Sequence, residues 1–451
     1  MIQFPNSYWK KTWSHKDEVG NKLKGAILAA GKGKRMDPLT SNILPKPLFP
    51  LGGKVPMAEV WVRRFVESGI VDISMNLCVL LETIKRYFKD GSKFAANINY
   101  VEEDIPSGTL GGVCKQGLGR NAKRVISREK MTKIREFTGS TLIVPSGDVV
   151  TNFGSQLLEE MYEIHRKKGA AFSMVLIPIP SERKIEFGTA ILENIEERNS
   201  MLSKVGIIKD FMEKDPNSPS NLSNGSIYMI EMDLLKTLDP LRTQASLDTP
   251  NPFYDFGKHV FPAMLGKLPY LNLPKDLTLL GIQYDGNWFD VGRKRDYLLV
   301  NELLLDGEIN IALPYEKLPW GYLGANVSID FSQVTLIPPV VIGNNCIIEP
   351  GVTLGPYAII GDDWVIERGA CIQHSVLWER YPYFTEEGYE IDINERKLVD
   401  RHEVRRNVKV DQCIVASGTI DKNIKEKTVD VLEDGNLSIL SIDYIPDSPR
   451  A

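Results

Sequence analysis

The first 300 residues alternate short apolar runs with longer amphipathic segments. The runs have the length and composition of buried strands. They are GAILAAG (25–31), VDISMNLC (71–78), ANINYVEED (96–104), STLIVPSGDVV (140–150) and AAFSMVLIPIP (170–180).

Helix signals lie between these runs. After Pro56, the apolar residues Met57, Trp61 and Phe65 recur at every fourth position, and Gly69 can end the helix. The segments 80–91 and 155–169 have the same amphipathic character. Strands that alternate with helices predict an α/β fold with a mixed, mainly parallel, Rossmann-like sheet. Ligands of such sheets bind beyond the carboxyl ends of the strands.

A six-residue apolar period replaces this pattern after residue 330. Its members are Leu336, Ile342, Ile348, Leu354, Ile360, Ile366 and Ile372. The residue four further on is usually small or branched, at Cys346, Val352, Ala358, Ala370 and Val376, with Trp364 as the exception. A period of six fits a parallel β-helix, whose stacked strands form inward columns. Val408, Ile414 and Ile420 return to the same count and predict one more coil.

These patterns predict the following division of the chain. We expect an N-terminal extension at 1–24, an α/β domain at 25–305, a linker at 306–328, a β-helix at 329–430 with a charged insertion at 377–405, and a tail at 431–451.

Composition and charge exclude several classes of protein. Of the 451 residues, 43% are apolar and 25% charged, as in a soluble globular protein, and the net charge of −5 argues against a nucleic-acid binder. The five cysteines are scattered, which favours a reducing, cytoplasmic compartment. We expect neither a signal peptide in the polar first 24 residues nor a membrane helix, since no apolar run reaches about 18 residues.

The loop after the first strand has the chemistry of a phosphate site. It matches neither the dinucleotide fingerprint nor the P-loop, yet Gly31 and Gly33 allow close approach of an anion, and Lys32, Lys34 and Arg35 supply charge. Lys46 lies between two prolines, which stiffen its backbone. A glycine turn with surface lysines would have the same local sequence.

Read together, the motifs resemble sugar-1-phosphate nucleotidylyltransferases, the enzymes that form nucleotide sugars and release pyrophosphate. The signature is LAAGKGKRMDPLT (28–40) followed by PKPL (45–48). Further landmarks appear in the family's order: EEDIPSGTLGG (102–112), SGD (146–148), FGTAILE (187–193), FMEKD (211–215), NGSIYMI (224–230), DFGKHVFPAML (255–265) and NWFDVG (287–292). Mannose-1-phosphate guanylyltransferases and glucose-1-phosphate adenylyltransferases are the most similar groups. The resemblance implies that the α/β domain at 25–305 is the nucleotidyltransferase domain, and that the β-helix is left-handed and serves homo-oligomer assembly or regulation.

The resemblance also implies roles for the phosphate-binding residues. Asp148 and Asp290 would hold Mg²⁺, which prefers one or two carboxylates with waters and substrate phosphates. Arg35 would stabilise the departing pyrophosphate, and Lys46 would contact the reacting phosphates.

The remaining implied roles concern the sugar and the base. Lys214 would hold the phosphate of the sugar, and four residues would bind or make room for its ring: Gly188, Glu213, Asn224 and Gly225, of which Gly225 leaves space. The base and nucleotide would be bound by Ala29, Ala30, Gly31, Gly33, Gly108 and Thr109, and by Glu103, whose ionised carboxylate would suit the donors of guanine. Glu102 or Asp104 could take the place of Glu103. Lys34 stands where the family has a threonine.

Two alternatives remain open at this stage. The β-helix could carry an acyltransferase activity, which would need a histidine base, and only His374 and His402 lie near it. The chain could also be a non-catalytic homologue that only binds. Retention of all five phosphate and metal groups (Arg35, Lys46, Asp148, Lys214 and Asp290) favours an enzyme, because no structural role needs the whole set.

Overall fold

The structure is a computed structural model of the whole chain. It describes residues 23–31, 33–37, 39–40, 44–104, 107–118, 122–127, 130–133, 141–239, 255–267, 277–379, 383–384, 390–391, 402–431 and 437–443. Lys32, most of the N-terminal extension and most of the insertion lie outside these residues.

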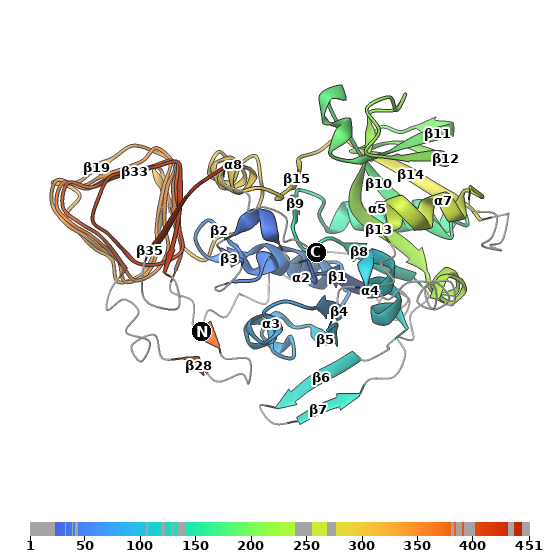
Figure 1. The fold of residues 1–451 in the computed structure, drawn as a ribbon, viewed down its shortest axis with the longest axis horizontal. Helices are drawn as coiled ribbons and strands as arrows, with labels where there is room; N and C mark the ends of the chain where they lie inside the picture. Colours follow the sequence, from blue (N-terminus) through green and yellow to red (C-terminus); the bar gives the residue numbers. More distant parts are fainter. Residues whose placement is uncertain are drawn as a thin grey trace. The chain divides into compact units, whose positions relative to one another are not determined.

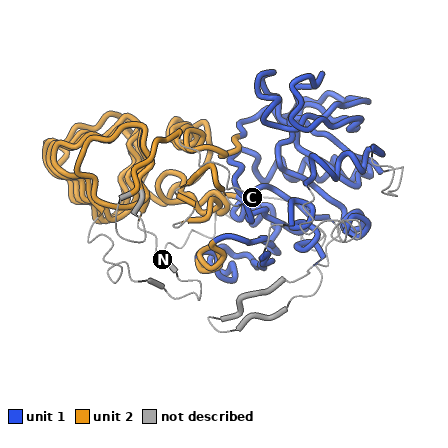
Figure 2. Tube along the Cα trace, in the orientation of Figure 1, with its two compact units in different colours: residues 1–31, 61–79, 87–288 blue, residues 32–60, 80–86, 289–451 orange. Residues whose placement is uncertain are grey.

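The chain folds into two compact units that are not continuous in sequence (Figure 2). Unit 1 consists of residues 1–31, 61–79 and 87–288, and unit 2 of residues 32–60, 80–86 and 289–451. The boundary therefore cuts through the glycine-rich loop after residue 31. The predicted α/β domain at 25–305 therefore contributes residues to both units.

Unit 1 is built around a short parallel sheet. Strand β1 (Leu23–Leu28) lies between β8 (Thr141–Pro145) and β4 (Asp72–Leu77), and β5 (Asn97–Glu102) follows β4, with all three contacts parallel. Each of these strands corresponds to an apolar run of the sequence. The predicted parallel core is confirmed, and Figure 1 shows it at the centre of this unit.

The rest of the same eleven-stranded sheet is mostly antiparallel. Its order is β10-β14-β12-β11-β13-β8-β1-β4-β5-β6-β7. The added strands are β10 (Phe172–Pro178), β14 (Leu279–Tyr284), β12 (Leu202–Glu213), β11 (Gly188–Glu197), β13 (Leu222–Glu231), β6 (Ala122–Ser127) and β7 (Lys130–Lys133). The long strands β11, β12 and β13 carry four residues for which the resemblance implies contact with the sugar: Gly188, Glu213, Asn224 and Gly225.

Three described helices follow the helix signals of the sequence: α2 (Met57–Glu67), α3 (Leu81–Phe88) and α5 (Ser155–Lys167). Others that were not predicted include α4 (Gly108–Gly117), α7 (Phe261–Met264) and α8 (Lys294–Leu305). Helix α2 begins directly after Pro56. Gly69, with φ of 74°, turns the chain after it, and Ile70 N donates to Phe65 O at 2.8 Å. Gly25 of β1 admits the Phe65 ring, since an added Cβ would lie 2.7 Å from that ring.

Most of unit 2 is a parallel β-helix, drawn in Figure 1 as a stack of coils in orange and red. Three sheets form its sides. The first contains β16 (Glu316–Leu318), β17 (Gly321–Leu323), β20 (Val340–Ile342), β23 (Ala358–Ile360), β26 (Ser375–Leu377), β31 (Ile414–Val415), β34 (Lys427–Val431) and β35 (Leu437–Ser441). The second contains β18 (Ser328–Ile329), β21 (Ile347–Ile348), β24 (Trp364–Ile366), β29 (His402–Val404) and β32 (Thr419–Ile420), and the third β19 (Thr335–Leu336), β22 (Thr353–Leu354), β25 (Cys371–Gln373), β30 (Lys409–Asp411) and β33 (Ile424–Lys425).

The predicted columns are confirmed and buried. Ile348 pairs with Ile366, and Leu354 with Ile372, each eighteen residues further on, which equals three hexads. The core also contains Cys346, Val352, Ala358, Trp364 and Ala370. The phase of the last coil differs by one residue from the prediction in one sheet. Ile360 pairs with Leu377, seventeen residues on, and Leu377 with Val415, so that Leu377 and Val415 lie in the core cluster in place of the predicted Val376 and Ile414.

Strands extend this β-helix beyond the predicted bounds of 329–430. Strand β17 pairs with β20 in parallel, within the segment where we expected a linker. Strand β35, in the expected tail, pairs antiparallel with β34. Strand β29 belongs to a coil although it overlaps the end of the expected insertion. None of the described helices is long and apolar enough to cross a membrane.

Two adjacent isoleucines of β21 test the column. Ile348 is 3% exposed and Ile347 is 45% exposed. We expect Ile348→Ala to lower the free energy of unfolding by about 2–4 kcal/mol, because it leaves a cavity in the core. Ile347→Ala should change it by less than about 0.5 kcal/mol. Equal effects of the two substitutions in urea unfolding would contradict this orientation of the strand.

Candidate active site

The predicted site residues are distributed over both units. Unit 2 holds Gly33, Arg35, Lys46 and Asp290. Unit 1 holds Ala29, Ala30, Gly31, Glu103, Gly108, Thr109, Asp148, Gly188, Glu213, Lys214, Asn224 and Gly225.

The unit 2 part of the glycine-rich loop is a tight turn. Gly33 has φ of 60°, and an added Cβ would lie 2.9 Å from the Thr40 side chain. Met36 N donates to Gly33 O at 2.7 Å, and the Thr40 hydroxyl donates to Gly33 O at 3.1 Å and to Asp37 at 2.7 Å. Glycine is therefore required at 33 by backbone conformation and by space.

Arg35 is presented on this turn as an exposed cation. It lies in a 3₁₀ helix, Lys34–Met36, in which only Met36 is buried. An added Cβ at Gly292 would lie 3.1–3.3 Å from the Arg35 guanidinium, so the backbone at 292 runs directly beside it. Asp290, at the end of β15 (Trp288–Asp290), is half-buried, and its carbonyl accepts from Gly292 N at 2.7 Å. Within unit 2, the backbone at Gly292 thus lies beside Arg35, the predicted leaving-group arginine. Asp290, the predicted metal ligand, is two residues earlier in the chain.

Lys46 differs from Arg35 in its burial. It is 8% exposed and begins a 3₁₀ helix, Lys46–Leu48, with prolines on either side. Its Cβ lies 3.5 Å from the position that a Cβ would take at Gly33. The prediction of a positioned rather than a solvated cation is consistent with this burial.

In unit 1, a polar network lies at the carboxyl end of β1, where the glycine-rich loop begins. Ala29 N donates to Asn76 Oδ1 at 2.9 Å, and Asn76 Nδ2 donates to Glu103 Oε1 at 2.9 Å. The other oxygen of Glu103 accepts from Ser107 N at 2.7 Å, from the Ser107 hydroxyl, and from Lys115 at 3.4 Å. Glu103 is 3% exposed. The carboxylate that we expected to read the base is directed into the fold and holds β4, β5 and α4 together.

The first two residues of α4, Gly108 and Thr109, are both predicted to bind the nucleotide. Gly108 is its first residue and has φ of 73°. Thr109 Oγ1 accepts from Phe256 N at 2.9 Å, which ties α4 to the segment 255–267.

Asp148 follows β8 on the loop predicted for chemistry. Its carboxylate accepts from the Ser146 hydroxyl, and the side chain is half-buried. Ser146 N in turn donates to Ser226 O, and Gly147 N donates to Leu28 O, both at 2.9 Å. The Asp148 loop is therefore held by main-chain hydrogen bonds to the middle of β13 and to the end of β1, the two strands on either side of β8.

The predicted sugar residues meet at the ends of β11 and β12. Gly188 pairs with Glu213, and an added Cβ at Gly188 would lie 2.5 Å from Glu213 Oε2. An added Cβ at Gly257 would lie 2.2 Å from the same oxygen, so two glycines make room for this carboxylate. Burial, and next the charge of Asp255, raise the pKa of Glu213, although Lys214 and Lys258 oppose the shift. Lys214 is exposed and has φ of 53°.

Asn224 and Gly225 lie on β13. The Asn224 amide donates to the Tyr228 hydroxyl at 2.8 Å and accepts from Ser226 N at 2.9 Å. Gly225 O accepts from the Trp288 indole at 2.8 Å, and an added Cβ at Gly225 would lie 2.9 Å from Val175 O. Glycine at 225 is thus explained by the close approach of β10.

A family model described as nucleotidyl transferase matches residues 24–307. The chain belongs to the nucleotidyl transferase family. A UTP–glucose-1-phosphate uridylyltransferase of Synechocystis sp. is 29% identical over 79% of this chain and 83% of its own length. A mannose-1-phosphate guanyltransferase of Schizosaccharomyces pombe is 26% identical over 72% of this chain and 74% of its own. A crystal structure from Bacillus anthracis, assigned as a glucose-1-phosphate thymidylyltransferase with bound sucrose, has a TM-score of 0.48 and 19% identity, and covers 64% of this chain and 98% of that one.

The two predicted metal ligands, Asp148 and Asp290, lie in different units, and the donor chemistry of each holds by itself. Among the described residues, no three or more His, Cys, Asp or Glu side chains cluster. Mg²⁺ needs no such cluster, because it usually takes one or two carboxylates and completes its shell with phosphates and water. Asp148 and Asp290 are half-buried oxygen donors of this kind.

Both histidines considered for an acyltransferase have structural partners. His374 lies beside Glu302 at 2.9 Å and packs on Tyr357. His402 is 6% exposed, and its ring packs edge-on against Trp364 at 5.1 Å. His402 is thus buried against Trp364, whereas His374 is paired with a carboxylate, as a general base can also be.

Sequence reasoning missed three positions beside the candidate site residues: Asn76, Asp255 and Gly292. Asn76 carried a usable signal, an amide at the carboxyl end of a parallel strand. Asp255 and Gly292 carried none beyond their motifs, because their contacts with Glu213 and Arg35 depend on the fold.

The raised pKa of Glu213 predicts a pH-dependent cost to stability. A carboxyl group whose pKa is higher in the folded than in the unfolded protein favours the folded state at low pH. This contribution to stability is complete below the pKa of the unfolded state, 4.5, and is lost as the pH rises through the pKa of the folded state. We expect Glu213→Gln to melt at a higher temperature than the unmodified protein at pH 7 and to lose this advantage below pH 4.5.

The control is the same substitution at Glu197, whose carboxylate is 80% exposed. A Glu213→Gln variant that melts at or below the temperature of the unmodified protein at pH 7 would contradict this prediction.

Proposed function

We propose that this nucleotidyl transferase joins a nucleoside triphosphate to a sugar-1-phosphate, forms a nucleotide sugar, and releases pyrophosphate with the help of Mg²⁺. The observation that carries this proposal is the family match over residues 24–307, together with relatives aligned over most of their own length. Their names share a hexose-1-phosphate substrate and differ in the nucleotide. The proposal therefore leaves the base to experiment.

The reaction is an in-line attack of a sugar phosphate oxygen on the α-phosphorus, with pyrophosphate leaving. Such a transfer depends on positioning and on charge stabilisation. In this proposal, exposed Arg35 neutralises the departing pyrophosphate, buried Lys46 orients the reacting phosphates, and Lys214 binds the sugar phosphate. Arg35 suits its role because a guanidinium can bind two phosphate oxygens at once.

Asp148 and Asp290 are proposed to hold the metal ion. When bound, Mg²⁺ would neutralise charge on the triphosphate and fix its orientation. The nucleoside would lie on the backbone of Ala29, Ala30, Gly31, Gly33, Gly108 and Thr109. The sugar would lie against Gly188, Glu213, Asn224 and Gly225.

A substrate panel tests the proposal. Pyrophosphate release is measured for ATP, GTP, UTP, CTP and dTTP, each with glucose-1-phosphate or mannose-1-phosphate, with Mg²⁺ or with excess EDTA. We expect turnover with at least one pair and its loss in EDTA. No turnover with any pair, together with binding of a triphosphate, would favour a non-catalytic binding protein instead.

Assembly and location belong to the same proposal. We propose a homo-oligomer formed through the β-helix, to be measured by light scattering, and a cytoplasmic location. The five cysteines are all free, which suits a reducing compartment.

A further inference from the structure

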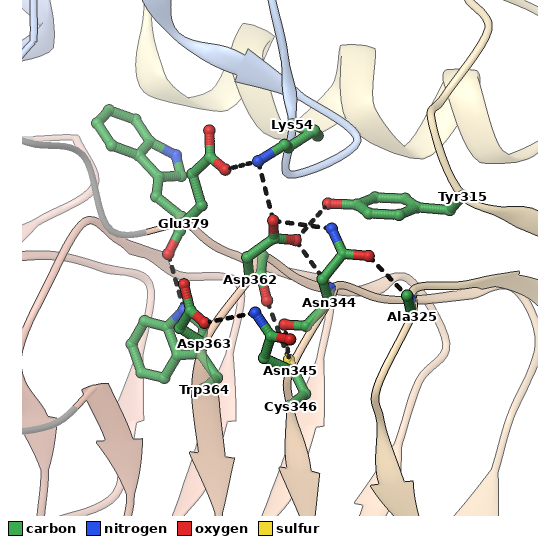
Figure 3. A network of polar contacts seen from close by, with 12 residues as sticks. Lys54, Tyr315, Ala325, Asn344, Asn345, Cys346, Asp362, Asp363, Trp364 and Glu379 are labelled. Atoms are coloured by element: carbon green, nitrogen blue, oxygen red, sulfur yellow. Dashed lines mark hydrogen bonds and ion pairs between the residues drawn. The ribbon is translucent and has the colours of Figure 1, made fainter. Parts of the chain in front are cut away.

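A buried charge cluster joins the segment after Lys46 to the β-helix within unit 2 (Figure 3). The Lys54 ammonium contacts Asp362 Oδ2 at 2.9 Å and also pairs with Glu379. Asp362 follows β23 and Glu379 follows β26, so both belong to coils of the β-helix. Their side chains are 11% and 12% exposed, and that of Lys54 is 31% exposed.

Asp362 is fixed by donors other than Lys54. The Tyr315 hydroxyl donates to its Oδ1 at 2.9 Å, Asn344 N to the same oxygen at 2.8 Å, and Asn344 Nδ2 to Oδ2 at 2.9 Å. Burial alone would raise the pKa of Asp362, but Lys54 and Asn344 outweigh it and lower the pKa. Burial would likewise lower the pKa of Lys54, and the two carboxylates raise it instead. The ion pair therefore persists across neutral pH.

Apolar packing supports the same junction. The Phe49 ring lies edge-on to Trp378, with centroids 4.7 Å apart, and to Tyr297, at 5.7 Å. The Tyr297 hydroxyl donates to Pro50 O. Gly53 passes so close to the β-helix that an added Cβ would lie 3.2 Å from Ile359.

The segment that contains Lys54, residues 49–57, follows directly after the 3₁₀ helix of Lys46. Phe49 N donates to Lys46 O at 3.0 Å, and Met57 N donates to Phe49 O at 3.1 Å. Between these bonds, β2 (Pro50–Leu51) pairs antiparallel with β3 (Val55–Pro56), and Lys54 lies in the turn that joins them. A short, hydrogen-bonded hairpin thus connects the ion pair to the 3₁₀ helix that carries Lys46.

We propose that Lys54, Asp362 and Glu379 are positioning residues for Lys46, so that the β-helix fixes the phosphate-binding segment. This inference rests on the proposed function, because it assigns Lys46 to the reacting phosphates. The three residues act through the hairpin backbone and touch no substrate themselves.

The test compares Lys54→Met, Lys54→Arg and Asp362→Asn with Asp363→Asn. Asp363 is the matched control, because it follows Asp362 but pairs with Asn345 at 3.0 Å and not with the hairpin. We expect Lys54→Met and Asp362→Asn to lower kcat about 10- to 100-fold, since small displacements of a positioning group have effects of this size. Lys54→Arg should restore most of the activity, and Asp363→Asn should behave like the unmodified protein.

Two further measurements separate positioning from general damage. In a Lys46→Ala background, Lys54→Met should reduce kcat by less than about twofold more, because the group that it positions is absent. Hydrogen exchange should accelerate at the amides of residues 49–57 in Lys54→Met and not in Asp363→Asn. Normal kcat in both Lys54→Met and Asp362→Asn, or full additivity with Lys46→Ala, would overturn the proposal.

The exchange measurement needs no activity. If the substrate panel finds no turnover, the proposed function fails. Unchanged hydrogen exchange in Lys54→Met would separately show that the contacts of Lys54 with Asp362 and Glu379 do not hold the hairpin.

Discussion

Asp290→Asn is expected to lower kcat by about 10³-fold or more while the protein stays folded. An amide keeps the size of the carboxylate but removes the charge that a metal ion needs, and a lost metal contact is worth several kcal/mol of transition-state stabilisation. The backbone carbonyl of Asp290, which accepts from Gly292 N, is unaffected by the substitution. Steady-state kinetics at saturating Mg²⁺ and thermal melting measure the two effects.

Asp285→Asn is the control for that experiment. Asp285 is an exposed carboxylate five residues earlier, bonded to the Gln283 amide at 2.7 Å. It should leave kcat within about twofold of the unmodified protein, as surface substitutions usually do. Turnover of Asp290→Asn close to that of Asp285→Asn would contradict the proposal that Asp290 is a metal ligand.

Arg35→Ala is expected to have a comparably large effect, a fall in kcat of about 10³-fold. An arginine that neutralises charge on transferring phosphates typically contributes 10³- to 10⁵-fold. Arg35→Lys should recover little of this loss, because an ammonium cannot form the paired contacts of a guanidinium. Both variants should melt normally, since Arg35 is exposed.

The neighbouring cation tests the specificity of that result. Lys34 is also exposed and lies on the same 3₁₀ helix. Lys34→Ala should reduce kcat by no more than about threefold if the effect at Arg35 depends on its position and not on the total charge of the loop. Equal losses at the two residues would contradict the assigned role of Arg35.

The sequence predicted the repetitive parts of the fold best. The columns of Ile348 and Leu354 follow from a spacing of six because each coil repeats the same local geometry. The phase shift at Leu377 could not be predicted, since a coil one residue shorter has no local sequence signal. The antiparallel strands β11, β12 and β13 were also missed, because their pairing is set by contacts between distant segments.

The candidate site shows the same limit. The sequence motifs were enough to identify candidate site residues such as Arg35 and Asp148. They could not show that Glu103 satisfies both oxygens inside the fold, because Asn76 and Lys115 reach it from separate elements. They also could not assign Lys54 a partner more than 300 residues away.

The discontinuous composition of unit 2 bears on how this protein can be dissected. Residues 32–60 are grouped with the β-helix, although they precede it by more than 250 positions. A fragment that ends at residue 305 would retain the complete signature motif but would strip Phe49 and Lys54 of Trp378, Asp362 and Glu379. The β-helix is therefore not a detachable module, and an exchange of domains between relatives should move residues 32–60 together with it.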